Sequence, residues 1–247
     1  MSTHLYGVHA VQAALDYSPK KIRLVYFDDQ RQDARLKSLL EALQAQGLKP
    51  EKADRKKLDK LADGKHHQGI VISVELPAMR GEEQLKRDVA ALEAMPFYLA
   101  LDQVQDPHNL GACLRSADAL GVHGVIVPKD NAAGITPTVC KVASGAAETV
   151  PVYQVTNLAR TLRWLKSQNI WLAGAAGEAA QSVLETDLNL PLVLVLGAEG
   201  DGLRRLTQQE CDFLIKIPMV GQVESLNVSV AAGILMFETF RQRQGQT

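Results

Sequence analysis

The sequence contains little cysteine and carries almost no net charge. Among 247 residues there are three cysteines, Cys113, Cys140 and Cys211, and the formal net charge is −1. An odd number of widely separated cysteines forms neither a disulfide framework nor a zinc-ligand pattern, so we expect reduced thiols packed inside the protein. The charge balance argues against a protein that coats nucleic acid through bulk charge alone, but it is compatible with a local basic patch.

Long apolar runs are also missing. No uninterrupted stretch reaches the ~20 residues that span a bilayer, and the first ten residues lack the basic start and apolar core of a secretory signal. We therefore predict a cytoplasmic protein with no membrane partner. The adjacent His66 and His67 would point to opposite faces of a strand, so we predict no metal site.

The first part of the chain has the pattern of a small α/β unit. Strand-type runs at residues 22–27 and 70–74 alternate with helical patterns, and the clearest helix has leucines at spacings of three and four: Leu36, Leu39, Leu40 and Leu43. We assign this domain to residues 1–76. Residues 77–95 are rich in charged residues and glutamine, which predicts a flexible linker with one or two exposed helical turns.

Strands and helices alternate throughout residues 96–247, which we assign to a second domain. Apolar strand patterns begin near residues 97, 124, 151, 170, 191 and 213, with helices predicted near 109–120, 136–147, 158–168 and 226–242. The strand at 192–196 is apolar on both faces, as expected for a parallel sheet covered by helices on both sides. The predicted fold class is α/β.

Polar side chains and glycines gather after three of these strands, where open α/β sheets bind ligands. After the first strand, Asn109 is placed to cap a helix, and the buried stripe of that helix leaves Arg115 pointing outward. After the strand at 192–196, a glycine-rich loop carries Glu199, a candidate base or orienting acceptor. Before the last helix, Ser225 and Asn227 occupy the usual place of capping groups.

Each of these segments has a simpler interpretation when it is taken alone. Asn109 and Asn227 would then be ordinary helix caps, Arg115 a surface cation, and the glycines a plain turn. A dinucleotide fingerprint is disfavoured because Arg205 occupies the place of its third glycine and the loop comes late in the chain.

Taken together, the three segments resemble the ordered motifs of the SpoU (TrmH-like) RNA 2′-O-methyltransferases of the SPOUT superfamily. The matching patterns are NxGxxxR at residues 109–115, LGxEGxGL at 196–203, and IPMxGxxxSLNVSVAAG from Ile217. The YGVHAV segment near the N-terminus and the His-Gln-Gly-Ile at 67–70 resemble the extension of the members that methylate a guanosine of bacterial 23S ribosomal RNA. The resemblance covers almost the whole chain.

The resemblance implies a fold and an activity. The second domain would be a trefoil-knotted α/β domain with a mainly parallel sheet, and the first an L30-like domain that binds the RNA substrate. The activity would be methyl transfer from S-adenosylmethionine to a ribose 2′-hydroxyl, most specifically of a guanosine in 23S ribosomal RNA. The resemblance places the cofactor at Gly197, Ile217 and Leu226.

Site residues and partners also follow from the resemblance. The catalytic group would be Asn109, Arg115, Glu199, Ser225 and Asn227. Arg115 would activate the hydroxyl, although a guanidinium pKa above ~12 leaves open whether it acts as a base or as a phosphate anchor. The implied partners are 23S ribosomal RNA or a pre-ribosomal particle, not DNA, and a second copy of the chain packed along the last helix.

Two alternatives stay open. The first is a transfer-RNA ribose 2′-O-methyltransferase, against which the L30-like extension counts. The second is a non-catalytic RNA-binding protein of ribosome assembly, against which the intact motif residues count. The basic cluster in the first domain likewise has two interpretations, a solvated helix face or an RNA-binding patch, and composition alone favours the former: Lys52, Arg55, Lys56, Lys57, Lys60 and Lys65.

Overall fold

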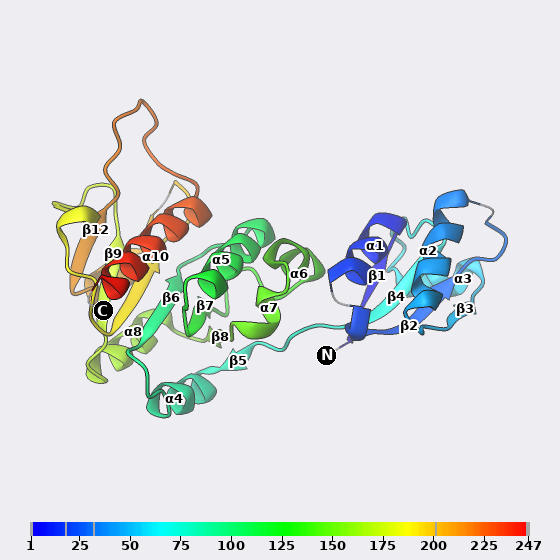
Figure 1. Ribbon diagram of the computed structural model, residues 1–247, viewed down its shortest axis with the longest axis horizontal. Coiled ribbons are helices and arrows are strands. Elements are labelled where there is room, and N and C mark those ends of the chain that lie inside the picture. Colours follow the sequence, from blue (N-terminus) through cyan, green and yellow to red (C-terminus); the bar gives the residue numbers. More distant parts are fainter. Residues whose placement is uncertain (1, 18, 32, 201, 246–247) are drawn as a thin grey trace. The chain divides into compact units, whose positions relative to one another are not determined.

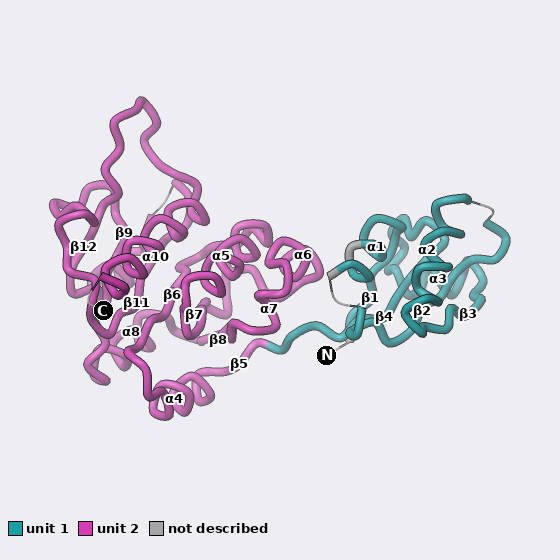
Figure 2. The backbone as a smooth tube through the Cα atoms, in the orientation of Figure 1, with its two compact units in different colours: residues 1–78 teal, residues 79–247 magenta. Residues whose placement is uncertain are grey.

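Two β-sheets organise the chain, one in each of two compact units, residues 1–78 and 79–247 (Figures 1 and 2). The computed structural model describes residues 2–17, 19–31, 33–200 and 202–245. Both units combine strands and helices, which confirms the predicted α/β class. Among the described residues, no helix combines the length and apolarity needed to cross a membrane.

The sheet of the first unit has four strands in the order β1-β4-β2-β3. The strands are β1 (Ser2–Tyr6), β2 (Ile22–Phe27), β3 (Pro50–Lys52) and β4 (Ile70–Glu75). The helices are α1 (Val8–Tyr17), η1 (Pro19–Lys21), α2 (Ala34–Ala45) and α3 (Arg55–Leu61). β4 runs antiparallel to β1 and β2, and β3 is parallel to β2, so the carboxyl ends of β1, β2 and β3 meet the amino end of β4.

The sheet of the second unit has eight strands, and all its strand pairs are parallel. Their spatial order is β10-β12-β9-β11-β6-β7-β8-β5. The strands are β5 (Arg80–Gly81), β6 (Phe97–Leu101), β7 (Gly124–Pro128), β8 (Val152–Val155), β9 (Trp171–Ala175), β10 (Gln181–Ser182), β11 (Leu192–Leu196) and β12 (Phe213–Lys216).

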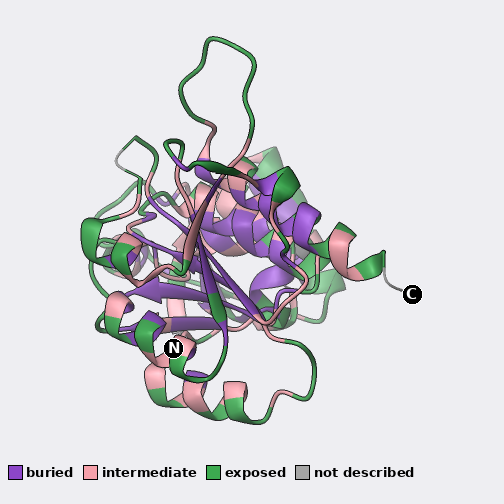
Figure 3. Cartoon of the chain, turned by 90° about the vertical axis from the view of Figure 1, so that its left-hand side faces the viewer, coloured by how far each residue is buried: buried purple, intermediate pink, exposed green. Residues whose placement is uncertain are grey.

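Helices cover both faces of this sheet. They are α4 (Glu82–Ala90), α5 (Pro107–Ala119), α6 (Pro137–Ala143), α7 (Ala146–Thr149), α8 (Leu158–Ser167), η2 (Val183–Glu185), α9 (Arg205–Glu210) and α10 (Val228–Gln244). Leu194 of β11 packs in a cluster with residues of α5, α6 and α10, while Val193 packs in a cluster with residues of α4 and α8. Successive β11 residues thus serve opposite cores, and the strands appear buried in Figure 3.

The segment after the first unit is not the flexible linker that its composition predicts. Its helix α4 packs on the second unit, where Leu85 is fully buried in a cluster with Tyr153. The Asp88 carboxylate accepts hydrogen bonds from Tyr153 (2.7 Å) and Arg80 (2.8 Å). Burial by itself would raise the pKa of Asp88, but the hydrogen bonds from Tyr153, Gln84 and Arg80 outweigh burial and lower it. Much of residues 77–95 is therefore an ordered part of the second unit.

Two further expectations are refined by the structure. The helix predicted near 136–147 is two helices, because Ser144 and Gly145 adopt left-handed backbone conformations with φ of 50° and 99°. The three cysteines form no disulfide within the described residues. Cys113 is fully buried, and burial raises its pKa to about 12, whereas Cys140 and Cys211 are half-buried.

Replacing Leu85 with alanine tests whether α4 is part of the folded second unit. Because the side chain is fully buried, we expect Leu85→Ala to lower the free energy of unfolding by about 2–5 kcal/mol. The exposed Arg87 on the same helix provides the control, since Arg87→Ala should change it by less than about 0.5 kcal/mol. Chemical denaturation of both variants measures the difference, and equal small effects would restore the linker interpretation.

Candidate functional site

Four parallel strands of the second unit end at the same edge of the sheet, and each is followed by a polar or glycine-rich loop. β11 lies between β6 and β9, and β12 lies beside β9. The first motif lies in α5, which follows the loop after β6, the second lies in the loop after β11, and the third runs from the loop after β12 into α10. That loop, residues 217–227, projects from the unit in Figures 1 and 3. Carboxyl ends of parallel strands are where open α/β sheets bind ligands.

The loop after β11 folds back on itself and can do so only with glycines. A Cβ on Gly197 would lie 1.9 Å from the carbonyl oxygen of Gly202, a distance that no side chain tolerates. Gly200 and Gly202 have φ of 89° and 65°, which favours glycine. The Gly202 amide donates to the Ala198 carbonyl at 3.0 Å and closes the turn. This explains the glycines of the second motif as a backbone requirement.

An ion pair between a buried carboxylate and an exposed arginine fixes the far end of this loop. Asp102, directly after β6, is fully buried, and its carboxylate accepts hydrogen bonds from Arg204 Nε (2.8 Å) and from the Arg204 backbone amide (3.2 Å). A buried carboxylate is stable only when it is paired and hydrogen-bonded. Neither residue was predicted to have a role, although an acid directly after an apolar strand, as Asp102 is, can indicate a polar group at the edge of the sheet.

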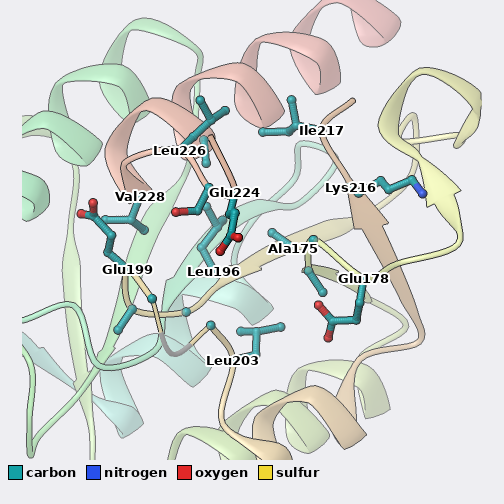
Figure 4. A pocket seen from close by; sticks show the side chains of 18 of the residues that line it. Ala175, Glu178, Leu196, Glu199, Leu203, Lys216, Ile217, Glu224, Leu226 and Val228 are labelled. Atoms are coloured by element: carbon teal, nitrogen blue, oxygen red, sulfur yellow. The ribbon is translucent and has the colours of Figure 1, made fainter. Parts of the chain in front are cut away.

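A pocket of about 550 Å³ opens between these loops, a volume within the range of small-molecule sites. Apolar side chains line much of it: Leu196, Leu203, Ile215, Ile217, Leu226 and Val228. Figure 4 shows Glu199 at one end, Glu178 at the other and Glu224 between them. Three carboxylates beside apolar walls suit a ligand that carries positive charge and a flat apolar part.

The positions predicted to hold a cofactor all line this pocket. Gly197 contributes backbone at the end of β11, Ile217 follows β12, and Leu226 lies just before α10. The pocket also contains Glu178 and Glu224, which sequence analysis did not single out. Glu178 lies outside the three motifs, and Glu224 occupies an unspecified position of the third, so only the folding of separate loops to one edge shows that both line the pocket.

The side-chain amide of Asn227 joins all three motifs. Its Oδ1 accepts hydrogen bonds from the Ser229 backbone amide (2.9 Å) and the Ser229 hydroxyl (2.6 Å), which caps α10. Its Nδ2 donates to Oδ1 of Asn109 at 3.0 Å and to Oε2 of Glu199 at 3.2 Å. We call Asn109, Glu199 and Asn227 the amide cluster. Asn109 and Glu199, which lie 118 and 28 positions before Asn227 in the sequence, thus meet it at the start of one helix.

The hydrogen bonds determine which way each amide points. Because Oδ1 of Asn227 accepts from a backbone N–H, its Nδ2 must face the other two residues. Asn109 accepts with its oxygen, so its own NH₂ group is directed away from Asn227. The cluster therefore offers outward N–H donors from Asn109 next to the acceptor oxygens of Glu199.

The first motif has a different helix cap from the one predicted. Asp106, not Asn109, caps α5, and its carboxylate accepts from the His108 backbone amide at 2.9 Å. Pro107 occupies the first turn, where its missing N–H costs nothing. Asn109 lies within the first turn and its side chain is used by the amide cluster. Gly111 is required because a Cβ there would lie 2.7 Å from Val142 Cβ of α6.

The two remaining predicted site residues lie outside the amide cluster. Arg115 is exposed on α5, and within the described part of the chain no hydrogen bond or ion pair engages its guanidinium. Ser225 is exposed on the loop before α10 and lines the pocket. The structure thus brings Asn109, Glu199 and Asn227 into direct contact, places Ser225 at the pocket, and leaves Arg115 facing solvent.

Comparisons with known proteins find matches for both units. A family model described as "SpoU rRNA Methylase family" matches residues 96–237, and one described as "RNA 2'-O ribose methyltransferase substrate binding" matches residues 4–79. The chain is 53% identical over 243 residues to the 23S rRNA (guanosine-2'-O-)-methyltransferase RlmB of Escherichia coli K12, covering 98% of this chain and 100% of that protein.

Two other matches agree with this. The RlmB protein of Vibrio vulnificus CMCP6 is 54% identical over 239 residues, covering 97% of this chain and 96% of that protein. Among solved structures, the SpoU methyltransferase AviRb from Streptomyces viridochromogenes in complex with the cofactor AdoMet superposes with a TM-score of 0.70 at 26% identity. This match covers 100% of this chain and 92% of that one. The parallel sheet of the second unit agrees with the predicted fold; the trefoil knot stays a prediction.

Variants of Asn227 separate its capping oxygen from its N–H donors. We expect Asn227→Ala to lower the free energy of unfolding by about 1 kcal/mol, because α10 loses its N-cap. Asn227→Asp keeps an acceptor for the cap but turns a carboxylate oxygen toward Oε2 of Glu199 and Oδ1 of Asn109, so it should cost at least as much as Asn227→Ala. Denaturant titration measures both.

The matched control is Asn157, which caps α8 through a 3.0 Å bond from the Arg160 amide. Asn157→Asp, by contrast, should cost less than Asn157→Ala, because it keeps the acceptor of the cap. If Asn227→Asp also costs less than Asn227→Ala, the cap rather than the contacts of Nδ2 stabilises the unit.

Proposed function

The chain belongs to the SpoU rRNA methylase family, and we propose that it transfers a methyl group from S-adenosylmethionine to the ribose 2′-hydroxyl of a guanosine in 23S ribosomal RNA. Identity of 53% over nearly the full length of RlmB supports the substrate. The observation that carries the proposal is the amide cluster, which holds Asn109, Glu199 and Asn227 together beside the pocket.

The pocket residues fit the cofactor. When bound, S-adenosylmethionine supplies a methyl carbon attached to a positively charged sulfur. Gly197, Ile217 and Leu226 would hold its adenine through backbone groups and apolar contact. The carboxylates of Glu178 and Glu224 would lie near its positive charges. Lys216 directs its ammonium group away from these carboxylates in Figure 4, so it does not neutralise them there.

The residues around the pocket can orient a ribose and favour loss of its proton. A 2′-hydroxyl is protonated at neutral pH, so its reaction needs a proton acceptor and close alignment with the methyl carbon. Glu199 offers carboxylate oxygens, and Asn109 offers N–H donors fixed by the amide cluster. The exposed Ser225 hydroxyl lies on the opposite loop of the pocket, where it can contact the ribose or its phosphate.

We assign Arg115 to the RNA phosphate next to the reacting ribose. A guanidinium with a pKa above ~12 is almost never neutral, so the form that could accept a proton is rarely present. Its planar donors match a phosphate in two hydrogen bonds. The exposed side chain has no ion pair with the described part of the chain, so it can bind a phosphate without first breaking one. Held there, it would stabilise negative charge that develops on the ribose oxygen.

The proposed enzyme is a homodimer. Large apolar side chains are exposed along one face of α10: Val230, Ile234, Phe237 and Phe240. Their spacing places them on one side of a helix, and a contiguous exposed apolar face of this kind marks an interaction surface. A second copy of the chain packed on α10 would bury them near the amide cluster, because Asn227 caps the same helix.

Methyl transfer from labelled S-adenosylmethionine to undermethylated 23S ribosomal RNA tests the activity. We expect one methylated guanosine, modified on the ribose, when the product is mapped by nucleotide. Free RNA and pre-ribosomal particles should both be offered, because either could be the natural substrate. Modification of transfer RNA instead, or tight RNA binding without transfer, would favour one of the two alternatives.

Arg115→Ala should reduce transfer by about 10²-fold or more, as expected when one group that stabilises transition-state charge is removed. Cofactor affinity, measured by calorimetry, should stay unchanged because Arg115 is not among the residues that line the pocket. The exposed Arg87 of α4 serves as the matched control, and Arg87→Ala should retain activity. Loss of cofactor binding in Arg115→Ala would contradict the assigned role.

Charged substitutions on α10 test the dimer. Ile234→Lys combined with Phe237→Lys should convert a dimer to a monomer in analytical ultracentrifugation, because two charges would be buried without partners. Leu184→Lys, at an exposed apolar side chain on η2, is the control and should leave the dimer intact. A wild-type monomer at micromolar concentration would contradict the proposal.

A further inference from the structure

The first unit has its own pocket, also of about 550 Å³, at one end of its sheet. It lies where the loop after β2, the helix α3 and the loop before β4 come together. Both loops meet there because the carboxyl end of β2 pairs with the amino end of β4, with Phe27 opposite Ile70. The pocket is thus a consequence of the antiparallel pairing.

Three consecutive residues of the loop before β4 hold this end of the unit together, each by a different contact. His67 is buried, and its Nε2 lies 3.2 Å from a carboxylate oxygen of Asp59 on α3. Gln68 accepts a hydrogen bond from the Val8 amide at the start of α1 (2.9 Å). The Gly69 carbonyl accepts from the Asp28 amide after β2 (3.0 Å).

Gly69 also makes room for an arginine. It has φ of 75°, and a Cβ there would lie 2.7 Å from Cδ of Arg31. The stem of Arg31 therefore packs directly against the glycine backbone, which restricts where its guanidinium can reach. The His67 ring is fixed as well, because its Nδ1 accepts from the Gly69 amide at 3.1 Å. The loop thus builds a defined rim, not a loose turn.

The exposed groups on this rim are mainly cations. Arg31, Arg55 and Lys65 line the pocket and are exposed. Within the described residues, no ion pair engages Arg55 or Lys65, and Arg31 pairs at 2.9 Å with Asp33. The two acids of the lining keep their charge, but each accepts a contact within the unit: Asp59 lies against His67, and Asp28 accepts a 3.0 Å bond from the Gln30 backbone amide. The positive charge open to a ligand is therefore that of Arg55 and Lys65, with Arg31 shared with Asp33.

We infer that this pocket binds an unpaired nucleotide of the RNA substrate, with its phosphates held by Arg31, Arg55 and Lys65. The inference rests on the proposed function and adds to it the face of the first unit that contacts RNA. Cations alone would suit any anion. The pocket also offers the second carboxylate oxygen of Asp28 and the side-chain amide of Gln30, and these groups suit the hydrogen-bonding edge of a base. Unpaired bases are the parts of RNA that proteins read individually.

A triple variant tests the site: Arg31→Gln, Arg55→Gln and Lys65→Gln in the full-length protein. The matched control removes three positive charges from the other end of the same sheet: Lys20→Gln, Arg23→Gln and Lys49→Gln. The probe is 23S ribosomal RNA transcribed in vitro, and its binding is measured at several salt concentrations.

Each phosphate contact to single-stranded RNA contributes about 0.7 to the slope of log affinity against log salt, so three lost contacts should make the slope shallower by about 2. Only the pocket variant should show this change. Its KM for RNA should rise while kcat is retained, because the lost contacts are not at the reacting atoms. Cofactor affinity should be unchanged in both variants.

The outcomes separate this inference from the proposed function. If the wild-type protein methylates the RNA and both triple variants lose the same salt dependence, the unit attracts RNA by overall charge and the pocket assignment is wrong. If neither variant changes binding, the assignment is also wrong. If the wild-type protein transfers no methyl group but the pocket variant alone loses RNA affinity, the pocket stands and the proposed activity fails.

Discussion

The geometry of the site depends on one side-chain amide. Asn227 must accept with its oxygen to cap α10, and this leaves its two N–H groups for Asn109 and Glu199. A flipped amide would lose the cap and present a donor to the Ser229 N–H. The orientation of the cluster is therefore set by the start of a helix whose Leu235 is fully buried in the core. Local capping chemistry thereby aligns three distant motifs.

Much of this arrangement could be predicted from the sequence because the signals were local. The runs at residues 22–27 and 192–196 are strands with those bounds, and the leucine spacing around Leu39 marks α2. The site residues were singled out because they follow strands and because the motifs resemble those of a known family. The prediction that Asn109 caps α5 was wrong: Asp106 caps it, and only the contact with Asn227 shows what Asn109 does.

The missed features depend on residues distant in sequence. Asp102 and Arg204 pair across 102 positions, and nothing in the sequence around Asp102 indicates which residue is its partner. Residues 77–95 have a polar composition, yet Leu85 of α4 is fully buried in a cluster with Tyr153, and Asp88 accepts a hydrogen bond from the Tyr153 hydroxyl. The average composition of a segment does not reveal one buried side chain. The sequence pattern also does not show which part of the sheet that side chain packs against.

The two kinds of recognition in the proposed function have different physical requirements. Methyl transfer needs oxygen, carbon and sulfur in line, and misplacement by about 1 Å can cost 10²-fold in rate. The groups beside the cofactor pocket are accordingly fixed by hydrogen bonds, by Asp102, and by glycines that allow no alternative backbone. Attraction of a cation to phosphate falls off slowly with distance and tolerates movement. In the proposed function, exposed cations such as Arg55 would therefore attract the RNA, and the amide cluster would orient the reactive ribose.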